Sequence, residues 1–330
     1  MGRNRNMKGK KGNLLAWILE RRALSLAVLI LVLAVIMALT TTTFTKSENL
    51  FNIFKQATIT IILATGMTFI ISGGGIDLSV ANIMSLSCVL TCIVYNATHS
   101  DILSILTGAL IGVAAGIANG VLATHFELPP FIVSMGISNV CGGLALVITK
   151  GFPVLVSDQS LMYKIGQKST FGIPNLIYMI PLFVAIGQFI LRETVLGSRM
   201  QAVGGNPVAA ALSGLNVKFM KVLTTTIGGL FAGISGYLLA GRLNSGSPSS
   251  GGTLGMDAIC ATVVGGTSMM GGGGDVVGSM VGAILMQLIK NGLTQYEVNM
   301  YWQTAVIGVV LIAVCAIDVI ARKASTLTNK

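Results

Sequence analysis

Charge is what this 330-residue chain has least of. Only 10% of its residues are Asp, Glu, Lys or Arg, whereas a soluble domain carries about 25%. Hydrophobic residues make up 53% of the chain, and the mean hydropathy is +0.82. These values exclude an ordinary soluble domain. They predict an all-α membrane protein that crosses the bilayer many times.

The sequence also lacks the motifs of the common hydrolases and metalloenzymes. No HExxH or CxxC pattern occurs, and the five cysteines lie in apolar segments without metal-ligand spacing. The run Gly271–Gly274 leads into Asp275, so the phosphate-binding pattern Gly-x-x-x-x-Gly-Lys-Ser/Thr is missing. We therefore expect a non-catalytic chain that binds no metal and no cofactor. If its work is driven by ATP, another polypeptide hydrolyses the ATP.

The net charge of +10 indicates membrane topology, not nucleic-acid binding. The basic residues flank apolar segments, and they form no basic face interleaved with aromatic residues. Basic flanks stay in the cytoplasm, which places three regions there: the N-terminal segment 1–23, the loop 192–218 and the tail 322–330. The remaining chain, 24–321, is predicted to be one transmembrane domain in contact with the lipid bilayer.

Hydropathy predicts ten membrane spans within this domain. Six of them separate the basic N-terminal segment from the basic loop, and four more bring the chain back to the same side. The count therefore agrees with cytoplasmic N- and C-termini. The spans run near 24–43, 51–71, 80–96, 102–124, 130–149, 174–191, 219–240, 257–270, 276–294 and 303–321.

A polar stretch inside the loop 192–218 carries the start and stop signals of a two-turn helix. Asn206 is a favoured N-cap residue, Pro207 suits the first helical position, and Gly214 suits a left-handed C-cap. A short, rigid helix on the cytoplasmic surface is what a motor subunit needs in order to push on a transport path. The alternative interpretation is an ordinary loop between spans.

The two halves of the chain echo one another. Asp77 follows a glycine cluster after the second span, and Asp257 follows one after the seventh. Asn119-Gly120 is matched by Asn291-Gly292. The predicted topology places Asp77 and Asp257 on opposite sides, which indicates inverted-repeat halves with broken helices, as in many transporters. The alternative is coincidence in a chain that contains 41 glycines.

Glycines precede each Asn-Gly pair at every fourth position, which predicts a groove along one helix face where a neighbouring helix approaches closely. These residues are Gly108, Gly112, Gly116 and Gly120 in the first half, and Gly274, Gly278 and Gly282 in the second.

Polar residues in or beside the spans are candidates either to line a solute path or to serve the structure. For the two acids, the structural alternative is capping of the next helix, and for the two asparagines it is hydrogen bonding between helices. The candidates are Asp77, Asn119, Asp257, Thr267, Ser268, Asn291 and Gln303.

Several motifs in one order resemble the ribose-type permeases of bacterial ABC sugar importers, over roughly residues 47–320. They are Gly75–Val80, Leu128–Val133, 204–217, Gly236–Ala240, Arg242–Pro248, Met256–Ile259, Gly265–Ser268 and Asn291–Leu293. Three positions depart from the family pattern, since Ala81, Met256 and Cys260 replace a usual glycine, leucine and alanine. None of them removes a polar group, so they weaken the inference about substrate more than the resemblance.

The resemblance implies a permease subunit of an importer for ribose or another simple sugar, in the bacterial inner or plasma membrane. Its expected partners are a second permease copy or a paralogue, an extracytoplasmic sugar-binding protein, and an ATPase that is commonly a fused tandem. ATP and Mg would bind to that ATPase. A different class of function, an autonomous ion-coupled secondary transporter, would also show inverted repeats.

The resemblance further identifies 206–214 as the helix that couples the permease to the ATPase. The residues expected to serve this coupling are Gly204, Asn206, Pro207, Ala210, Leu212, Ser213 and Gly214.

Overall fold

A computed structural model describes residues 22–299, 301–310 and 312. Residues 1–21 and 313–330 lie outside the described part. The predicted N-terminal segment, much of the last predicted span and the predicted tail therefore fall largely or wholly there.

The first half of the chain folds into five helices whose ends agree with local sequence signals. α3 ends at the glycine cluster that begins with Gly73, the hydroxyl of Ser100 accepts a hydrogen bond from Leu103 N at the start of α5, and Pro130 occupies the first turn of α6. The helices are α2 (Arg22–Thr40), α3 (Ser47–Ser72), α4 (Val80–Thr98), α5 (Asp101–His125) and α6 (Pro130–Thr149).

The second half combines long helices with short elements at the two ends of the molecule. β1 pairs antiparallel with β4, and β2 pairs with β3. In order, the elements are β1 (Val154–Leu155), α7 (Leu161–Gln167), β2 (Ser169–Thr170), β3 (Ile173–Pro174), η1 (Asn175–Tyr178), α8 (Met179–Glu193), α9 (Val195–Gly205), α10 (Pro207–Leu212), α11 (Val217–Leu243), β4 (Ser245–Gly246), α12 (Leu254–Val264) and α13 (Val276–Gln295), followed by a helix over Tyr301–Val310.

The all-α membrane class is confirmed. Within the described residues, seven helices are long and apolar enough to cross a membrane, and three shorter apolar helices overlap the other predicted spans. The prediction was wrong for the span 257–270: α12 begins earlier, at Leu254, and ends at Val264. Gly266, with φ +98°, follows that end, and such a backbone conformation does not continue a helix.

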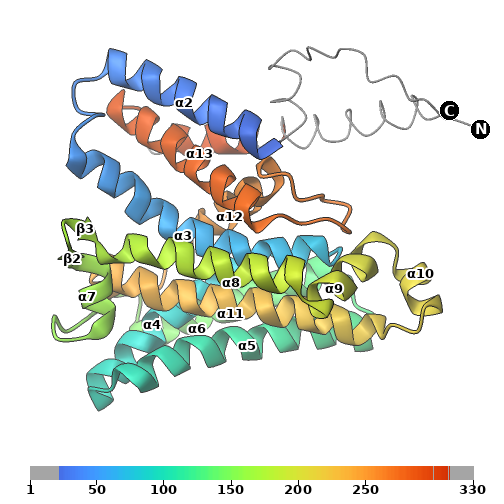
Figure 1. Ribbon diagram of the computed structural model, residues 1–330. Helices are drawn as coiled ribbons and strands as arrows, with labels where there is room; N and C mark the ends of the chain where they lie inside the picture. The colour runs from blue at the N-terminus through green and yellow to red at the C-terminus, as the bar shows by residue number, and fades with distance from the viewer. Residues whose placement is uncertain (1–21, 300, 311, 313–330) are drawn as a thin grey trace, which may run out of the picture.

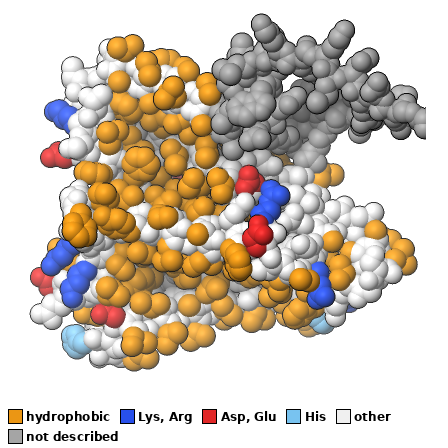
Figure 2. Space-filling model, in the orientation of Figure 1, with side chains coloured by type: hydrophobic (Ala, Val, Ile, Leu, Met, Phe, Trp, Pro, Cys, Tyr) orange, Lys and Arg blue, Asp and Glu red, His pale blue; other side chains and the backbone are white. Residues whose placement is uncertain are grey.

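The helices run between two distinct ends. Figure 1 shows α9 and α10 at one end and α7 with β2 and β3 at the other. In Figure 2, charged side chains gather toward these ends, with a broad hydrophobic band between them. α2 starts toward the α10 end and finishes at the opposite one (Figure 1). This arrangement agrees with a bundle that spans the bilayer along its long direction.

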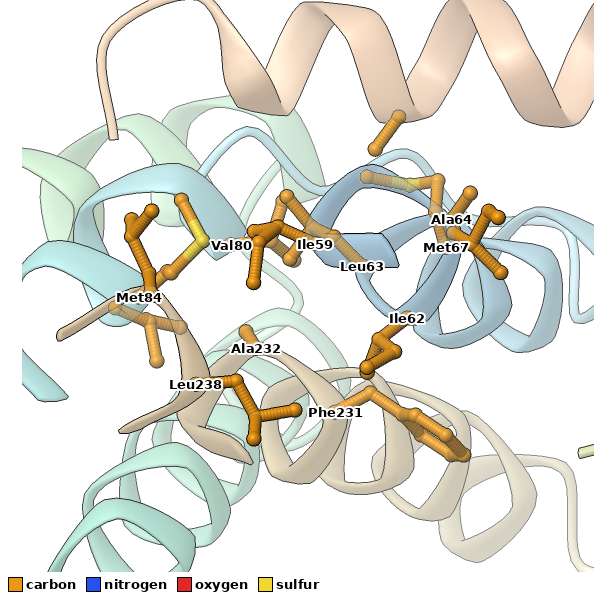
Figure 3. Packing of buried hydrophobic residues seen from close by; sticks show 14 of the residues in the cluster. Ile59, Ile62, Leu63, Ala64, Met67, Val80, Met84, Phe231, Ala232 and Leu238 are labelled. Atoms are coloured by element: carbon orange, nitrogen blue, oxygen red, sulfur yellow. The ribbon is translucent and has the colours of Figure 1, made fainter. Parts of the chain in front are cut away.

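The core forms where α3, α4 and α11 meet. Ile62 and Leu63 of α3, Met84 of α4 and Phe231 of α11 belong to one buried cluster (Figure 3). The outer helices instead expose large apolar side chains, among them Leu31, Leu110, Val140 and Phe189. A surface of this kind is stable against lipid, because lipid tails are as apolar as the side chains.

Glycines let the backbones of α5 and α11 touch. A Cβ at Gly112 would collide with the carbonyl oxygen of Gly229, and a Cβ at Gly116 would collide with that of Thr225. A Cβ at Gly120 would lie 2.6 Å from Cα of Val222, and one at Gly108 would lie 3.1 Å from the oxygen of Gly233. The first glycine row therefore faces protein along its whole length.

The second glycine row is shorter than predicted. Gly278 and Gly282 lie against the backbone of Gly265 and Ala261 at the end of α12. Gly274, however, precedes α13, so its assignment to the helical row was wrong. It lies instead in the turn before the helix, against Ser72, Thr68 and Leu191.

The helix contacts follow the expected repeat. α5 packs on α4 and α11, and α13 packs on α12 and α3. In each half, the helix that carries the Asn-Gly pair thus contacts the first long helix of the other half. α3 runs toward the α10 end and α11 runs away from it, so Asp77 and Asp257 lie toward opposite ends (Figure 1). An inverted repeat produces this arrangement.

We predict that Gly112→Leu destabilises the fold, because its side chain would displace the backbone of α11 at a cost of about 1–3 kcal/mol or more. The measurement is the yield and melting temperature of the purified protein in detergent. Gly143→Leu in α6 is the matched control, since a Cβ at Gly143 contacts nothing. Equal melting of the two variants would contradict tight α5–α11 packing.

Candidate functional site

α10 has the caps that its sequence predicts. The side chain of Asn206 accepts a hydrogen bond from Ala209 N at 3.0 Å, and Pro207 is the first helical residue. Ser213 is the C-cap, and Gly214 follows it with φ +83°. Leu215 N then donates to Ala210 O at 3.1 Å, which closes the helix end. This six-residue helix is therefore a defined structural unit.

The outer face of α10 is apolar. Leu212 is 86% exposed, and Val208, four residues earlier on the same face, is also exposed. Ala210 is buried toward the bundle. Because α10 projects from the end of the molecule (Figure 1), its apolar residues lie beyond the hydrophobic band and suit contact with another protein.

Three glycine-rich turns meet directly behind α10. Gly204–Gly205 at the end of α9 lies against the turn 72–75 at the end of α3 and against Gly271–Gly272 of the segment before α13. A Cβ at Gly272 would lie 2.7 Å from Cα of Gly205, and Gly272 N donates to Ser72 O at 2.9 Å. The chain that leads into α10 therefore touches both halves of the repeat. We call these three turns the glycine junction.

Asp77 is buried and has partners on both carboxylate oxygens. Oδ1 accepts from the backbone N and the hydroxyl of Ser79, and Oδ2 accepts from Asn119 Nδ2 at 2.6 Å. Asp77 orders the residue that precedes α4, but it does not cap the later N–H groups of that helix, so the capping prediction was right only in its location. Asn119 acts as the predicted hydrogen-bond partner between segments.

Asp257 has a different environment. It lies inside the first turn of α12, not before the helix, so the prediction that it caps α12 was wrong. Its Oδ2 forms an ion pair with Lys290 of α13. Among the described residues, its Oδ1 has no hydrogen-bond partner, although the carboxyl group is buried.

A row of amides continues from this ion pair along α3 and α13. Gln287 donates to Gln56 at 2.9 Å, and Asn291 donates to Asn49 at 2.8 Å. Gln295 also donates to Asn49, at 3.0 Å. Gln287, Asn291 and Gln295 share one face of α13, since they are spaced by four residues, and Lys290 lies on the neighbouring face, against Asp257 of α12. This polar row lies in the half of the bundle away from α10.

The other predicted residues lie apart from this row. The hydroxyl of Thr267 accepts from Asp275 N at 3.3 Å, and Ser268 N donates to Gly273 O at 3.1 Å, so both order the segment before α13. That segment is irregular, as its glycine content predicts. Gln303 donates to Thr294 and to Val298 O, both at 3.1 Å. The seven candidates thus form separate groups instead of one site.

A cavity of about 450 Å³ opens at the α10 end of the bundle. Its walls come from the turn after α3, the end of α5, the link 127–130 and the start of α11. Lys218 and Lys221 line it, and Lys218 lies 3.8 Å from Glu127. Gly120 also lines the cavity, so the cavity reaches the residue next to Asn119 on α5.

Sequence reasoning missed Lys290, Gln56 and Gln287. Each is a polar residue within a predicted apolar span, and that is a signal in itself, since ionisable and amide side chains are costly in hydrocarbon. The three-residue spacing of Gln287 and Lys290, which places both near one face of a helix, was also visible in the sequence. What the sequence lacked was the pairing, because Lys290 and Asp257 are 33 residues apart and lie on different helices.

Comparison with known proteins places this geometry in context. Residues 49–315 match the family described as "branched-chain amino acid transport system / permease component". The chain is 31% identical to the ribose import permease protein RbsC of Escherichia coli K12, over 92% of this chain and 94% of that protein. It is 33% identical to the L-arabinose ABC transporter permease protein AraH of Azospirillum brasilense, over 92% and 88%. No solved structure matches the chain.

We predict that Asn119→Ala destabilises the protein more than Asn291→Ala. The first change leaves a buried oxygen of Asp77 without its partner, which costs about 1–3 kcal/mol or more for a charged group. After the second change, Asn49 still accepts from Gln295 and donates to Phe44 O. Thermal unfolding in detergent measures both. The reverse order would show that the Asp77 network contributes little.

Proposed function

The chain belongs to the ABC transporter permease family that it matches over most of its length, and we propose that it is the membrane-spanning subunit of an importer for a monosaccharide. Its relatives include permeases named for import of ribose and for L-arabinose. A pentose is therefore the first substrate to test. Permease subunits of this family are multi-pass membrane proteins and are not catalytic.

The observation that carries the proposal is α10. A capped helix with exposed Val208 and Leu212 projects at the end that carries Arg192, Arg199, Lys218 and Lys221, and it is attached to the glycine junction. In the proposed complex it docks on a separate ATPase, which binds ATP and Mg²⁺. Movement of α10 is then transmitted to the end of α3 and to the start of α13. The contacts that transmit it join backbone to backbone, with no flexible side chain between them.

The solute crosses by way of polar groups in both halves of the bundle. The polar row on α3 and α13 serves the outer half, and the cavity beside Gly73–Gly75 serves the inner half. A second copy of the chain or a paralogue completes the pathway. The N- and C-termini and α10 face the cytoplasm, in agreement with the positive-inside rule.

The opposite end receives an extracytoplasmic sugar-binding protein. Phe171, in the turn between β2 and β3, is 96% exposed, and Leu155 of β1 is also exposed. Apolar side chains outside the hydrophobic band suit contact with a protein partner. An autonomous ion-coupled transporter would need neither partner, and family membership speaks against it.

The experiment is uptake in proteoliposomes. The chain is co-purified with the ATPase encoded beside it, reconstituted, and supplied with the neighbouring binding protein and radiolabelled pentoses or hexoses. We expect uptake that requires both ATP and the binding protein. Uptake that is driven by an ion gradient without ATP would instead support the autonomous transporter.

We predict that Leu212→Asp abolishes co-purification of the ATPase and at least 90% of sugar-stimulated ATP hydrolysis, because a charge replaces the apolar contact of α10. The residue is exposed, so the melting temperature of the chain should change by only a few degrees. Phe171→Asp, at the opposite end, is the control for co-purification alone and should retain the ATPase. Normal stimulation by the Leu212 variant would remove α10 from the coupling role.

A further inference from the structure

We propose that Asp257 and Lys290 form the contact point for a polyhydroxylated, uncharged solute in the outer half of the membrane domain. The inference rests on the proposed function and names the residues and the substrate chemistry of its pathway. The recognised group is a pair of adjacent hydroxyls. One hydroxyl donates to the carboxylate of Asp257, and its neighbour accepts from the ammonium of Lys290.

The equivalent acids of the two halves differ in their hydrogen bonds: one is fully bonded within the protein, and the other retains an oxygen for a ligand. Asp77 has neutral partners on both oxygens, Ser79 and Asn119. Its counterpart Asp257 has a charged partner on one oxygen and, within the described residues, none on the other. A buried acceptor without a partner is rare in folded proteins and calls for an explanation.

An ion pair is not needed to hold α12 against α13. Gly278 and Gly282 already bring the two backbones into contact, and the equivalent acid of the first half is held by an amide. Charges within membrane helices are unfavourable and are concentrated along solute or ion paths. The pair therefore has a role besides packing.

The pair is reachable from one side. The side chain of Lys290 is 18% exposed and that of Asp257 is 2% exposed, so a solute approaches the pair by way of Lys290. Among the described residues, the ammonium is hydrogen-bonded to Asp257, and it has three N–H groups to offer. A solute hydroxyl can bind the ammonium first and reach Oδ1 when the helices part.

The surroundings favour hydroxyls over charged groups. The pair carries no net charge, and Gln287, one turn before Lys290, and Gln56 on α3 supply amide donors and acceptors. An anionic solute would lose its hydration and meet the Asp257 carboxylate, and a cationic solute would meet Lys290.

The decisive variant is the double change Asp257→Asn with Lys290→Gln. It keeps a hydrogen-bonded pair between α12 and α13 and removes both charges. In the reconstituted complex we expect a melting temperature within a few degrees of the wild type and sugar uptake at least 10-fold slower. Each single change leaves one charge unpaired and should lower both uptake and melting.

Asp77→Asn is the matched control at the equivalent acid. It retains an oxygen that accepts from Ser79, and uptake per folded complex should stay within twofold of the wild type. Uptake by the double variant within twofold of the wild type would overturn the inference and leave the proposed function intact. Absence of ATP-dependent uptake by the wild-type complex would overturn both.

A second measurement applies even if the double variant folds poorly. Thr294→Cys places a thiol at an exposed position one turn after Lys290 and leaves Asp257 and Lys290 unchanged. Cys315 is replaced by Ser in the same chain, and the other four cysteines are buried. A membrane-impermeant maleimide should label this thiol from outside, and sugar-loaded binding protein with ATP should slow the labelling at least fivefold. A thiol that is not labelled, or whose labelling is unchanged by sugar, would contradict the inference.

Discussion

Direct contact between helix backbones is the constraint on which the rest of this structure depends. In lipid the hydrophobic effect does not drive helices together, so close packing and polar contacts must hold them. Gly112 against Gly229 and Gly282 against Ala261 bring carbonyl oxygens into positions that any Cβ would occupy. The first contact joins the two halves of the bundle, the second joins α13 to α12 within one half, and the polar groups between these helices are held at hydrogen-bonding distance.

The same kind of contact links α10 to the membrane domain. Gly204–Gly205 touches the turn after α3 and the segment before α13 without intervening side chains. Interfaces without flexible side chains transmit a displacement instead of absorbing it, because packed interiors are poorly compressible. In the proposed complex, a displacement of α10 would therefore act on both halves of the repeat at once, which alternating access between inverted halves requires.

Much of the fold followed from the sequence because its signals are local. Hydropathy located the spans, and Asn206, Pro207 and Gly214 marked α10, since caps depend on only a few adjacent residues. The errors arose where the outcome depends on packing. Gly274 has the spacing of a helical row, but the turn before α13 includes it, and Asp257 entered α12 because that helix begins at Leu254.

The pairing of Asp257 with Lys290 could not be predicted, because the contact depends on the register between α12 and α13, which Gly278 and Gly282 set. Once that register is known, the repeat itself becomes informative. Two halves with related folds provide an internal comparison, in which the shared features serve the architecture and the differences serve the function. The amide at Asp77 and the ammonium at Asp257 are such a difference. The inner acid orders a turn, and the outer acid retains an oxygen for a passing solute.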